Sequence, residues 1–151
     1  MAKQILITGG AGFLGSHLAD AYLAKDYQVM ALDDLSTGSL DNISHLRQNP
    51  KFTFVKHDLN KKLPKKVIGT KLSVIANLAS PASPPHYQRL AIETLQVGSV
   101  GVQQVLELAL KHKARLFHAS TSEVYGDPEV HPQPESYKGS VNCYGPRSMY
   151  D

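Results

Sequence analysis

The chain of 151 residues has one cysteine, no tryptophan and no long apolar run. Because Cys143 has no second cysteine to pair with, an internal disulfide is excluded. No segment reaches the roughly 18 consecutive apolar residues of a membrane-crossing helix, and no signal-like apolar segment follows Met1. These absences predict a cytoplasmic protein that does not associate with membranes.

Positive charge is slight and mostly scattered. The formal net charge is +3 and the sequence pI is about 8.9. Only Lys61, Lys62, Lys65 and Lys66 lie close together in the sequence. Such a short cluster is more often a solvated loop or helix face than a phosphate-binding stripe, so we expect no nucleic-acid partner.

Length and composition are those of one globular domain. Hydrophobic residues make up 42% and charged residues 19% of the chain, without a low-complexity tract. A chain of this size buries about two-thirds of the surface that its unfolded form exposes. We therefore expect a single packed domain over residues 1–151, with no internal repeat.

Short apolar segments alternate with helical patterns along the chain. Five segments predict buried strands, at residues 4–8, 28–33, 52–56, 72–78 and 115–120. Helices are predicted at 13–25 and 90–111, the second with an apolar face formed by Leu95, Val102, Val105, Leu106 and Leu110. Strands joined by helical crossovers predict an α/β fold, a Rossmann-like doubly wound parallel sheet in the order 3-2-1-4-5.

Two stretches, 80–86 and 121–145, show no regular pattern and are rich in residues that favour turns. Each directly follows a predicted strand. Ligands of open parallel sheets bind at the carboxyl ends of the strands. We therefore predict that both stretches form walls of a site.

A glycine-rich segment, TGGAGFLG at 8–15, lies between the first strand and the first helix. Gly9, Gly12 and Gly15 have the spacing G-x-x-G-x-x-G, and Gly10, Gly12 and Gly15 have the spacing G-x-G-x-x-G. Glycines here allow a tight turn, a close backbone approach to a pyrophosphate and packing of helix on strand. The free N–H groups of the helix start favour phosphate, so the segment predicts a dinucleotide site.

Acidic residues end the second strand about 20 residues further on. A carboxylate at Asp33 can accept hydrogen bonds from both hydroxyls of an adenosine ribose and would repel a 2′-phosphate, which favours NAD over NADP. The alternative is that Asp33 and Asp34 only form a turn.

Three other positions have two interpretations each. Asp58, after the third strand, either accepts from the adenine amino group or caps a helix. The small residues at 78–80 either let a cofactor cross the sheet edge or form a proline-induced turn. His118, within an apolar strand, is interpreted as a core histidine rather than a base, and no cluster has metal-ligand spacing.

Three segments together resemble a known family: TGGAGFLGSHL at 8–18, LASPASPPHY at 78–87, and STSEVYGDPEVHPQPESYKGSVNCYGPRSMYD at 120–151. They are similar to the extended short-chain dehydrogenase/reductase family and, within it, to the UDP-glucuronate decarboxylases (UDP-xylose synthases). The glycine motif indicates the superfamily alone. The segments SPASPP and STSEVYGDPEVHPQ distinguish the decarboxylases from the epimerases and dehydratases.

The resemblance implies roles for particular residues. Tyr150 would be the first residue of the family's Tyr-x-x-x-Lys pair, and three residues would flank the reacting sugar: Thr121, Ser122 and Glu123. Weaker matches to segments near the UDP-sugar are Pro84, Tyr87 and Arg147. The NAD site would be lined by Gly9, Gly12, Phe13, Leu14, Gly15, Asp33, Asp34, Thr37, Gly38, Asp58, Leu59, Leu78 and Ser80.

The reaction that the resemblance implies converts UDP-glucuronate to UDP-xylose and carbon dioxide. NAD removes a hydride from C4 of the sugar, carbon dioxide leaves from the resulting β-keto acid, and the hydride is returned. A tyrosine, with an ordinary pKa of about 10, needs a nearby positive charge to act as the base.

The sequence departs from the family in two places. Its last residue is Asp151, so neither the lysine of the pair nor the family's C-terminal substrate domain lies within it, and Gln96-Val97-Gly98 stands where the family usually has Lys-Thr-Asn. We expect the 151-residue chain alone to bind NAD without useful decarboxylation, and its uncovered apolar surface to cause self-association or homo-oligomer formation.

Two alternatives to a decarboxylase remain open from the sequence. One is a related enzyme, a UDP-sugar 4-epimerase or a dTDP-glucose 4,6-dehydratase, which would share the glycine loop and Asp33. The other is a nucleotide-binding module without catalytic activity.

Overall fold

A parallel sheet of five strands forms the centre of the computed structural model, which describes residues 3–151. Its order is β3-β2-β1-β4-β5, and all four pairings are parallel. The strands are β1 (Gln4–Thr8), β2 (Gln28–Asp33), β3 (Phe52–Lys56), β4 (Val74–Asn77) and β5 (Arg115–His118). The predicted fold class and strand order are therefore confirmed.

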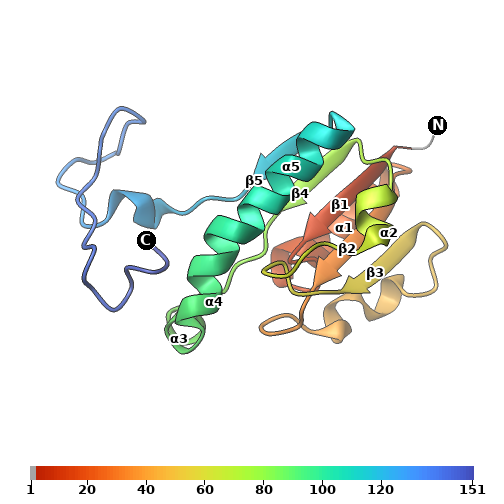
Figure 1. Cartoon of the computed structure of the whole chain (residues 1–151), viewed down its shortest axis with the longest axis horizontal. Helices are drawn as coiled ribbons and strands as arrows, with labels where there is room; N and C mark the ends of the chain where they lie inside the picture. The colour runs from red at the N-terminus through yellow and green to blue at the C-terminus, as the bar shows by residue number, and fades with distance from the viewer. Residues whose placement is uncertain (1–2) are drawn as a thin grey trace.

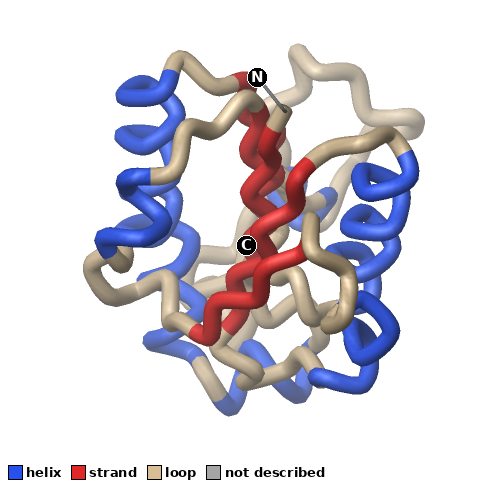
Figure 2. Tube along the Cα trace, turned by 90° about the vertical axis from the view of Figure 1, so that its right-hand side faces the viewer, coloured by secondary structure: helices blue, strands red, loops and turns tan. Residues whose placement is uncertain are grey.

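Helices cover both faces of this sheet (Figures 1 and 2). On one face lie α1 (Phe13–Ala24) and the 3₁₀ segment η1 (Leu40–Leu46). On the other lie α2 (Lys65–Gly69) and α5 (Val102–His112). Right-handed crossovers of a parallel sheet produce this three-layer arrangement.

The central strand β1 is buried on both sides. Ile5 and Ile7 pack into the core beneath α1, whereas Leu6 packs into the core beneath α5. All three side chains are fully buried. Burial on both faces explains why the sequence of β1 is an uninterrupted apolar run rather than an alternating one.

One continuous helical stretch connects β4 to β5 on the second face. It consists of α4 (Ala91–Gln96), a π-helical segment η2 (Val97–Gly101) and α5. The prediction of a helix over 90–111 is confirmed within one residue at each end. Within residues 3–151, no helix is long and apolar enough to traverse a bilayer.

The apolar face predicted for this helix is not the face that packs on the sheet. Val105 is fully buried, but Leu95, Leu106 and Leu110 are exposed, Leu110 by 79%. The core contacts of the helix also include Leu108 and Ala109. The helix is apolar on more than one side, so periodicity alone does not identify which side faces the sheet.

Two stretches that were predicted to be irregular contain short helices. α3 (Pro84–Arg89) starts inside the 80–86 stretch, with Pro84 in its first turn, where the missing proline N–H costs no hydrogen bond. The 3₁₀ segment η3 (Ser122–Tyr125) lies in the 121–145 stretch, and the side chain of Thr121 caps it. The rest of the chain after η3 forms loops beside the end of the sheet (Figure 1).

The burial difference along α5 gives a stability prediction. Val105→Ala should lower the free energy of unfolding by about 2 kcal/mol, because it removes two methyl groups from a closed core. Leu110→Ala, on the exposed side of the same helix, should change it by less than about 0.5 kcal/mol. Urea unfolding of both variants tests this, and equal losses would contradict the burial assigned to α5.

Candidate functional site

The loop between β1 and α1 holds backbone atoms too close together for side chains. Gly9 has φ +68°, and a Cβ there would lie 2.9 Å from the carbonyl oxygen of Leu78. A Cβ on Gly15 would lie 2.1 Å from the carbonyl oxygen of Gly9. Both glycines are therefore required if the loop is to lie against β4 and α1.

The N-terminus of α1 is open. Its N-cap is Gly12, no side chain caps it, and its first turn contains no acidic residue. The first N–H groups of a helix have no acceptor within the helix, and they carry the positive end of the helix dipole. A phosphate at this point would meet free donors and no competing carboxylate from the helix itself.

Asp33 joins the end of β2 to the glycine loop. Its Oδ2 accepts from the backbone N–H of Ala11 at 2.9 Å, and its Oδ1 accepts from the N–H of Leu35 at 2.9 Å. The side chain is largely buried. Each oxygen retains acceptor capacity beyond its backbone bond.

Burial raises the pKa of the Asp33 carboxyl above its ordinary value. The N–H groups of Leu35 and Ala11 oppose this rise, and the neighbouring Asp34 charge adds a smaller upward effect. The ionised carboxylate is therefore incompletely compensated in the protein, and donors from a ligand would stabilise it.

The loop after β2 closes over Asp33. Asp34 accepts from the N–H of Ser36 at 2.8 Å, and Leu35 has φ +68°. A Cβ on Gly38 would lie 3.0 Å from Oδ1 of Asp33. The turn-forming interpretation of the acidic pair thus describes Asp34 well, whereas Asp33 also holds the glycine loop.

A first cavity lies between this loop, the glycine loop and the ends of β3 and β4. It contains ten of the predicted cofactor residues: Gly9, Gly12, Asp33, Asp34, Thr37, Gly38, Asp58, Leu59, Leu78 and Ser80. Its other lining residues are Leu32, Ser36, His57, Asn60, Ala79, Pro81, Leu90, Glu93 and Val97. Carboxylates of Asp33, Asp34, Asp58 and Glu93 give it a negative lining.

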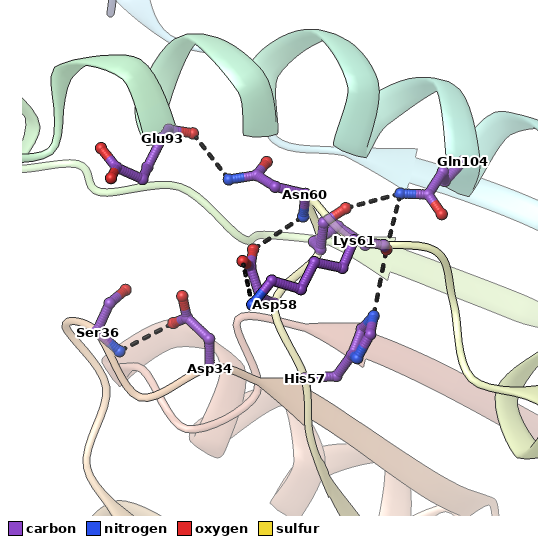
Figure 3. Close-up of polar contacts among 9 residues, drawn as sticks. Asp34, Ser36, His57, Asp58, Asn60, Lys61, Glu93 and Gln104 are labelled. Atoms are coloured by element: carbon purple, nitrogen blue, oxygen red, sulfur yellow. Dashed lines mark hydrogen bonds and ion pairs between the residues drawn. The ribbon is translucent and has the colours of Figure 1, made fainter.

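Asp58 forms a turn rather than a helix cap (Figure 3). Its Oδ1 accepts from the N–H of Asn60 at 2.9 Å, and Lys61 Nζ lies 3.6 Å from its Oδ2. The next helix, α2, begins only at Lys65. The helix-cap interpretation is therefore wrong, and the adenine-acceptor interpretation stays a prediction.

Asn60 and Glu93 were not identified from the sequence. Asn60 Nδ2 donates to the carbonyl oxygen of Glu93 at 3.3 Å, which links the loop after β3 to α4 (Figure 3). These residues are 33 positions apart, and neither belongs to a motif. Only the packing of α4 over the strand ends brings them together.

A second cavity continues from the first toward β5. The two share Gly9, Gly12, Thr37, Leu78, Ala79, Ser80 and Val97. The second also contains Phe13, Leu14, Gly15, Thr121 and Tyr150 from the predicted sites. The predicted cofactor residues therefore line one connected groove along the carboxyl ends of the strands.

The predicted catalytic residues are only partly brought together. Thr121 and Tyr150 line the second cavity, whereas Ser122 and Glu123 do not. Glu123 pairs with Arg147, whose Nη2 also lies 3.7 Å from Oδ1 of Asp151. The carboxylate of Glu123 thus contacts another predicted site residue instead of the cavity.

Tyr150 stacks on Tyr87 of α3, with ring centroids 4.7 Å apart and ring planes inclined by 13°. Tyr87 is buried beneath it. Pro84 starts the same helix. None of Pro84, Tyr87 and Arg147 lines either cavity, so the sequence-derived substrate contacts remain predictions.

His118 is not a core histidine. It is exposed and lines the second cavity. Its ring Nδ1 lies 3.0 Å from Nδ2 of Asn77. β5 is an edge strand of the described sheet. Its apolar sequence therefore did not require His118, its last residue, to be buried. Within residues 3–151, no three or more His, Cys, Asp or Glu side chains are grouped to hold a metal ion.

Comparison with known proteins identifies the family. Residues 6–151 match the family described as GDP-mannose 4,6 dehydratase. The chain belongs to the GDP-mannose 4,6 dehydratase family. This match extends over nearly the whole sequence, glycine loop and strand ends included.

Relatives of this dehydratase-family chain include UDP-glucuronic acid decarboxylases. It is 48% identical over 149 residues to UDP-glucuronic acid decarboxylase 1 of Xenopus tropicalis, covering 99% of this chain and 34% of that protein. It is 44% identical to UDP-glucuronic acid decarboxylase 5 of Arabidopsis thaliana, covering 98% and 42%. The predicted resemblance is confirmed, and the chain spans between about a third and two-fifths of the length of the curated relatives that it matches.

Solved structures of similar fold belong to related enzymes. One is a UDP-N-acetylglucosamine 4-epimerase from Methanobrevibacter ruminantium M1 in complex with UDP-N-acetylmuramic acid (26% identity, TM-score 0.80). Another is a dTDP-glucose 4,6-dehydratase from Bacillus anthracis in complex with NAD (29% identity, TM-score 0.79). The matches cover 99% of this dehydratase-family chain and 47% of each structure.

The raised pKa of Asp33 predicts a pH effect on stability. The folded chain holds the Asp33 proton to higher pH than the unfolded chain does, so stability falls as pH rises from the ordinary carboxyl pKa, about 4, through the raised value. Asp33→Asn should remove this part of the slope. Urea unfolding of both proteins between about pH 3.5 and 7 measures it, with the exposed Asp41→Asn as the control. If the stability of Asp33→Asn falls with pH as steeply as that of the wild type, the slope does not come from Asp33.

Proposed function

We propose that this chain is the NAD-binding portion of a UDP-glucuronate decarboxylase-like enzyme. The observation that carries the proposal is the placement of Asp33. Its buried carboxylate lies beside the glycine loop and the open N-terminus of α1, in a chain 48% identical to a UDP-glucuronic acid decarboxylase.

The residues fit the adenosine diphosphate part of NAD. A side chain at Gly9 or Gly15 would collide with backbone, so these glycines let the loop pack closely beside the helix start where a pyrophosphate would lie. The uncapped N–H groups of α1 would receive its charge. Ribose hydroxyls would donate to Asp33, and Asp58 would accept from the adenine amino group.

The charge of the first cavity favours NAD over NADP. Asp33 and Asp34 would lie beside a 2′-phosphate of NADP, and Asp58 and Glu93 line the same cavity. A phosphate would therefore meet like charges in a partly buried setting, where repulsion is only weakly screened. A hydroxyl there would instead donate to the carboxylate.

The sugar chemistry rests on the decarboxylase relatives and on the second cavity. NAD, when bound, supplies the acceptor for a hydride from C4 of the sugar. Tyr150 would take the C4 hydroxyl proton, and its stacking on Tyr87 would keep the ring at the cavity wall. Thr121, which caps η3, would hold a sugar hydroxyl beside it.

An epimerase or 4,6-dehydratase activity is the second candidate. It is favoured by the two solved structures described above, whereas the curated relatives at 43–48% identity favour decarboxylation. Calorimetric titration of the NAD-loaded protein with UDP-glucuronate, UDP-glucose and dTDP-glucose distinguishes them. Preferred binding of UDP-glucose or dTDP-glucose, whose sugars carry no carboxylate, would reject the decarboxylase assignment.

The cofactor assignment predicts the effect of one substitution. Asp33→Asn should weaken NAD binding by at least about tenfold, because hydrogen bonds to a charged acceptor contribute about 1.5–3 kcal/mol. It should weaken NADP binding less, since a like charge is removed at the same time. Isothermal titration calorimetry measures both affinities.

The control for this test is Asp41→Asn, which changes an exposed acid of η1 that lines neither cavity and should change NAD affinity by less than about threefold. Unchanged NAD affinity in Asp33→Asn would sink the assignment. Tighter binding of NADP than of NAD by the wild-type protein would also contradict the assignment of NAD as the cofactor.

A further inference from the structure

Three polar side chains stand side by side at the carboxyl end of the sheet. Thr8 of β1 is in register with Asn77 of β4, and Asn77 is in register with His118 of β5. Residues in register on adjacent strands have side chains on the same face. Thr8 and Asn77 are 0% and 2% exposed, whereas His118 opens into the second cavity.

The hydrogen bonds of Thr8 determine which atoms in this row are donors and which are acceptors. The Thr8 hydroxyl accepts from the N–H groups of Leu78 and Ala79, at 3.2 and 3.3 Å. Its single proton is donated to Oδ1 of Asn77, at 2.5 Å. Because Oδ1 is thus an acceptor for Thr8, the amide of Asn77 turns its Nδ2 donor toward His118.

The same reasoning assigns the proton of the imidazole. Nδ1 of His118 faces the Nδ2 donor of Asn77 at 3.0 Å, so Nδ1 is the acceptor. The proton of the neutral ring then resides on Nε2. Within residues 3–151, Nε2 has no hydrogen-bond partner, and the row therefore ends in an unused donor at the second cavity.

The cavity lining limits what this donor can meet. Among the described residues, no lysine or arginine lines the second cavity, and Asp151 contributes a negative charge to it. The phosphates of a ligand would lie at the open N-terminus of α1, so the His118 donor is left for a neutral oxygen acceptor. His118 does not line the first cavity, where Asp33 and Asp58 would hold the adenosine.

We infer that His118 is a ligand-contacting residue, whose Nε2–H donates to a neutral oxygen on the second nucleoside of the bound dinucleotide, the one that carries the nicotinamide. Thr8 and Asn77 are positioning residues that set the tautomer and the direction of the ring. The inference rests on the proposed NAD function. It adds a contact that the glycine loop and Asp33 do not supply.

Two substitutions separate ligand contact from a structural role. His118→Asn retains an acceptor for Asn77 near the ring Nδ1 position but has no donor at the position of Nε2. His118→Phe removes both and leaves the buried Nδ2 of Asn77 without its acceptor. Calorimetry gives the affinities of each protein for NAD and for ADP, and thermal unfolding gives the melting temperature.

Both variants should bind NAD about fivefold more weakly than the wild type, the usual effect of one neutral hydrogen bond. ADP affinity should stay within about twofold, because ADP lacks the second nucleoside that His118 would contact. The melting temperature should fall by a few degrees in His118→Phe and remain near the wild-type value in His118→Asn.

Wild-type affinity for NAD in His118→Asn would overturn the inference and leave His118 a purely structural residue. Equal losses of NAD and ADP would also overturn it, because the effect would then pass through the Leu78–Ala79 backbone. If the wild-type protein binds neither NAD nor ADP, the proposed function itself is wrong. This result is obtained before any variant is measured, so it is distinguishable from failure of the inference about His118.

Discussion

The hydrogen bond from the Ala11 backbone to the buried carboxylate of Asp33 is the constraint on which the groove depends. It crosses from the glycine loop to the end of β2, 22 residues away, and it fixes the loop relative to the sheet. The raised pKa shows that burial of this acid is only partly offset by its two backbone donors. The carboxylate that holds the loop in place is thus also the one that is proposed to accept hydrogen bonds from the cofactor.

The strand order then determines where a groove can form. β1 lies between β2 and β4, and the connections leaving β1 and β4 run to opposite faces, through α1 and through α4 to α5. The loops therefore separate above these two strands and leave a crevice. Both cavities contain Gly9 and Gly12 from one loop and Leu78 to Ser80 from the other, as this topology requires.

Much of the fold followed from local patterns, and the errors have physical causes. The bounds of β1, β2 and β3 were predicted to the residue. For β1 and β2 the reason is that strands buried on both faces have apolar runs ended by polar or glycine residues. The packed face of α5 was not predictable, since Leu106 and Leu110 are as apolar as the residues that touch the sheet. The burial of His118 was misjudged because its strand lies at the edge.

The candidate site also combines residues that local patterns predict with residues that only the packing of distant segments brings together. The glycine loop and Asp33 form a motif within one β-α-β unit, so spacing alone located them. Asn60, Glu93 and His118 come from three separate segments, and their positions depend on how α4 and β5 pack, which no local pattern encodes.

The Thr8 hydroxyl connects these local and non-local parts of the site. Through Leu78 and Ala79 it fixes the loop that lines both cavities, and through Asn77 it orients the imidazole at the far end of the second. A valine at this position would keep the shape but leave the Asn77 oxygen buried without a donor, and polar networks in buried settings are costly when only partly satisfied. The apolar core beneath β1 does not require a polar residue at position 8. The groove does, because the Thr8 hydroxyl is the donor to the buried oxygen of Asn77.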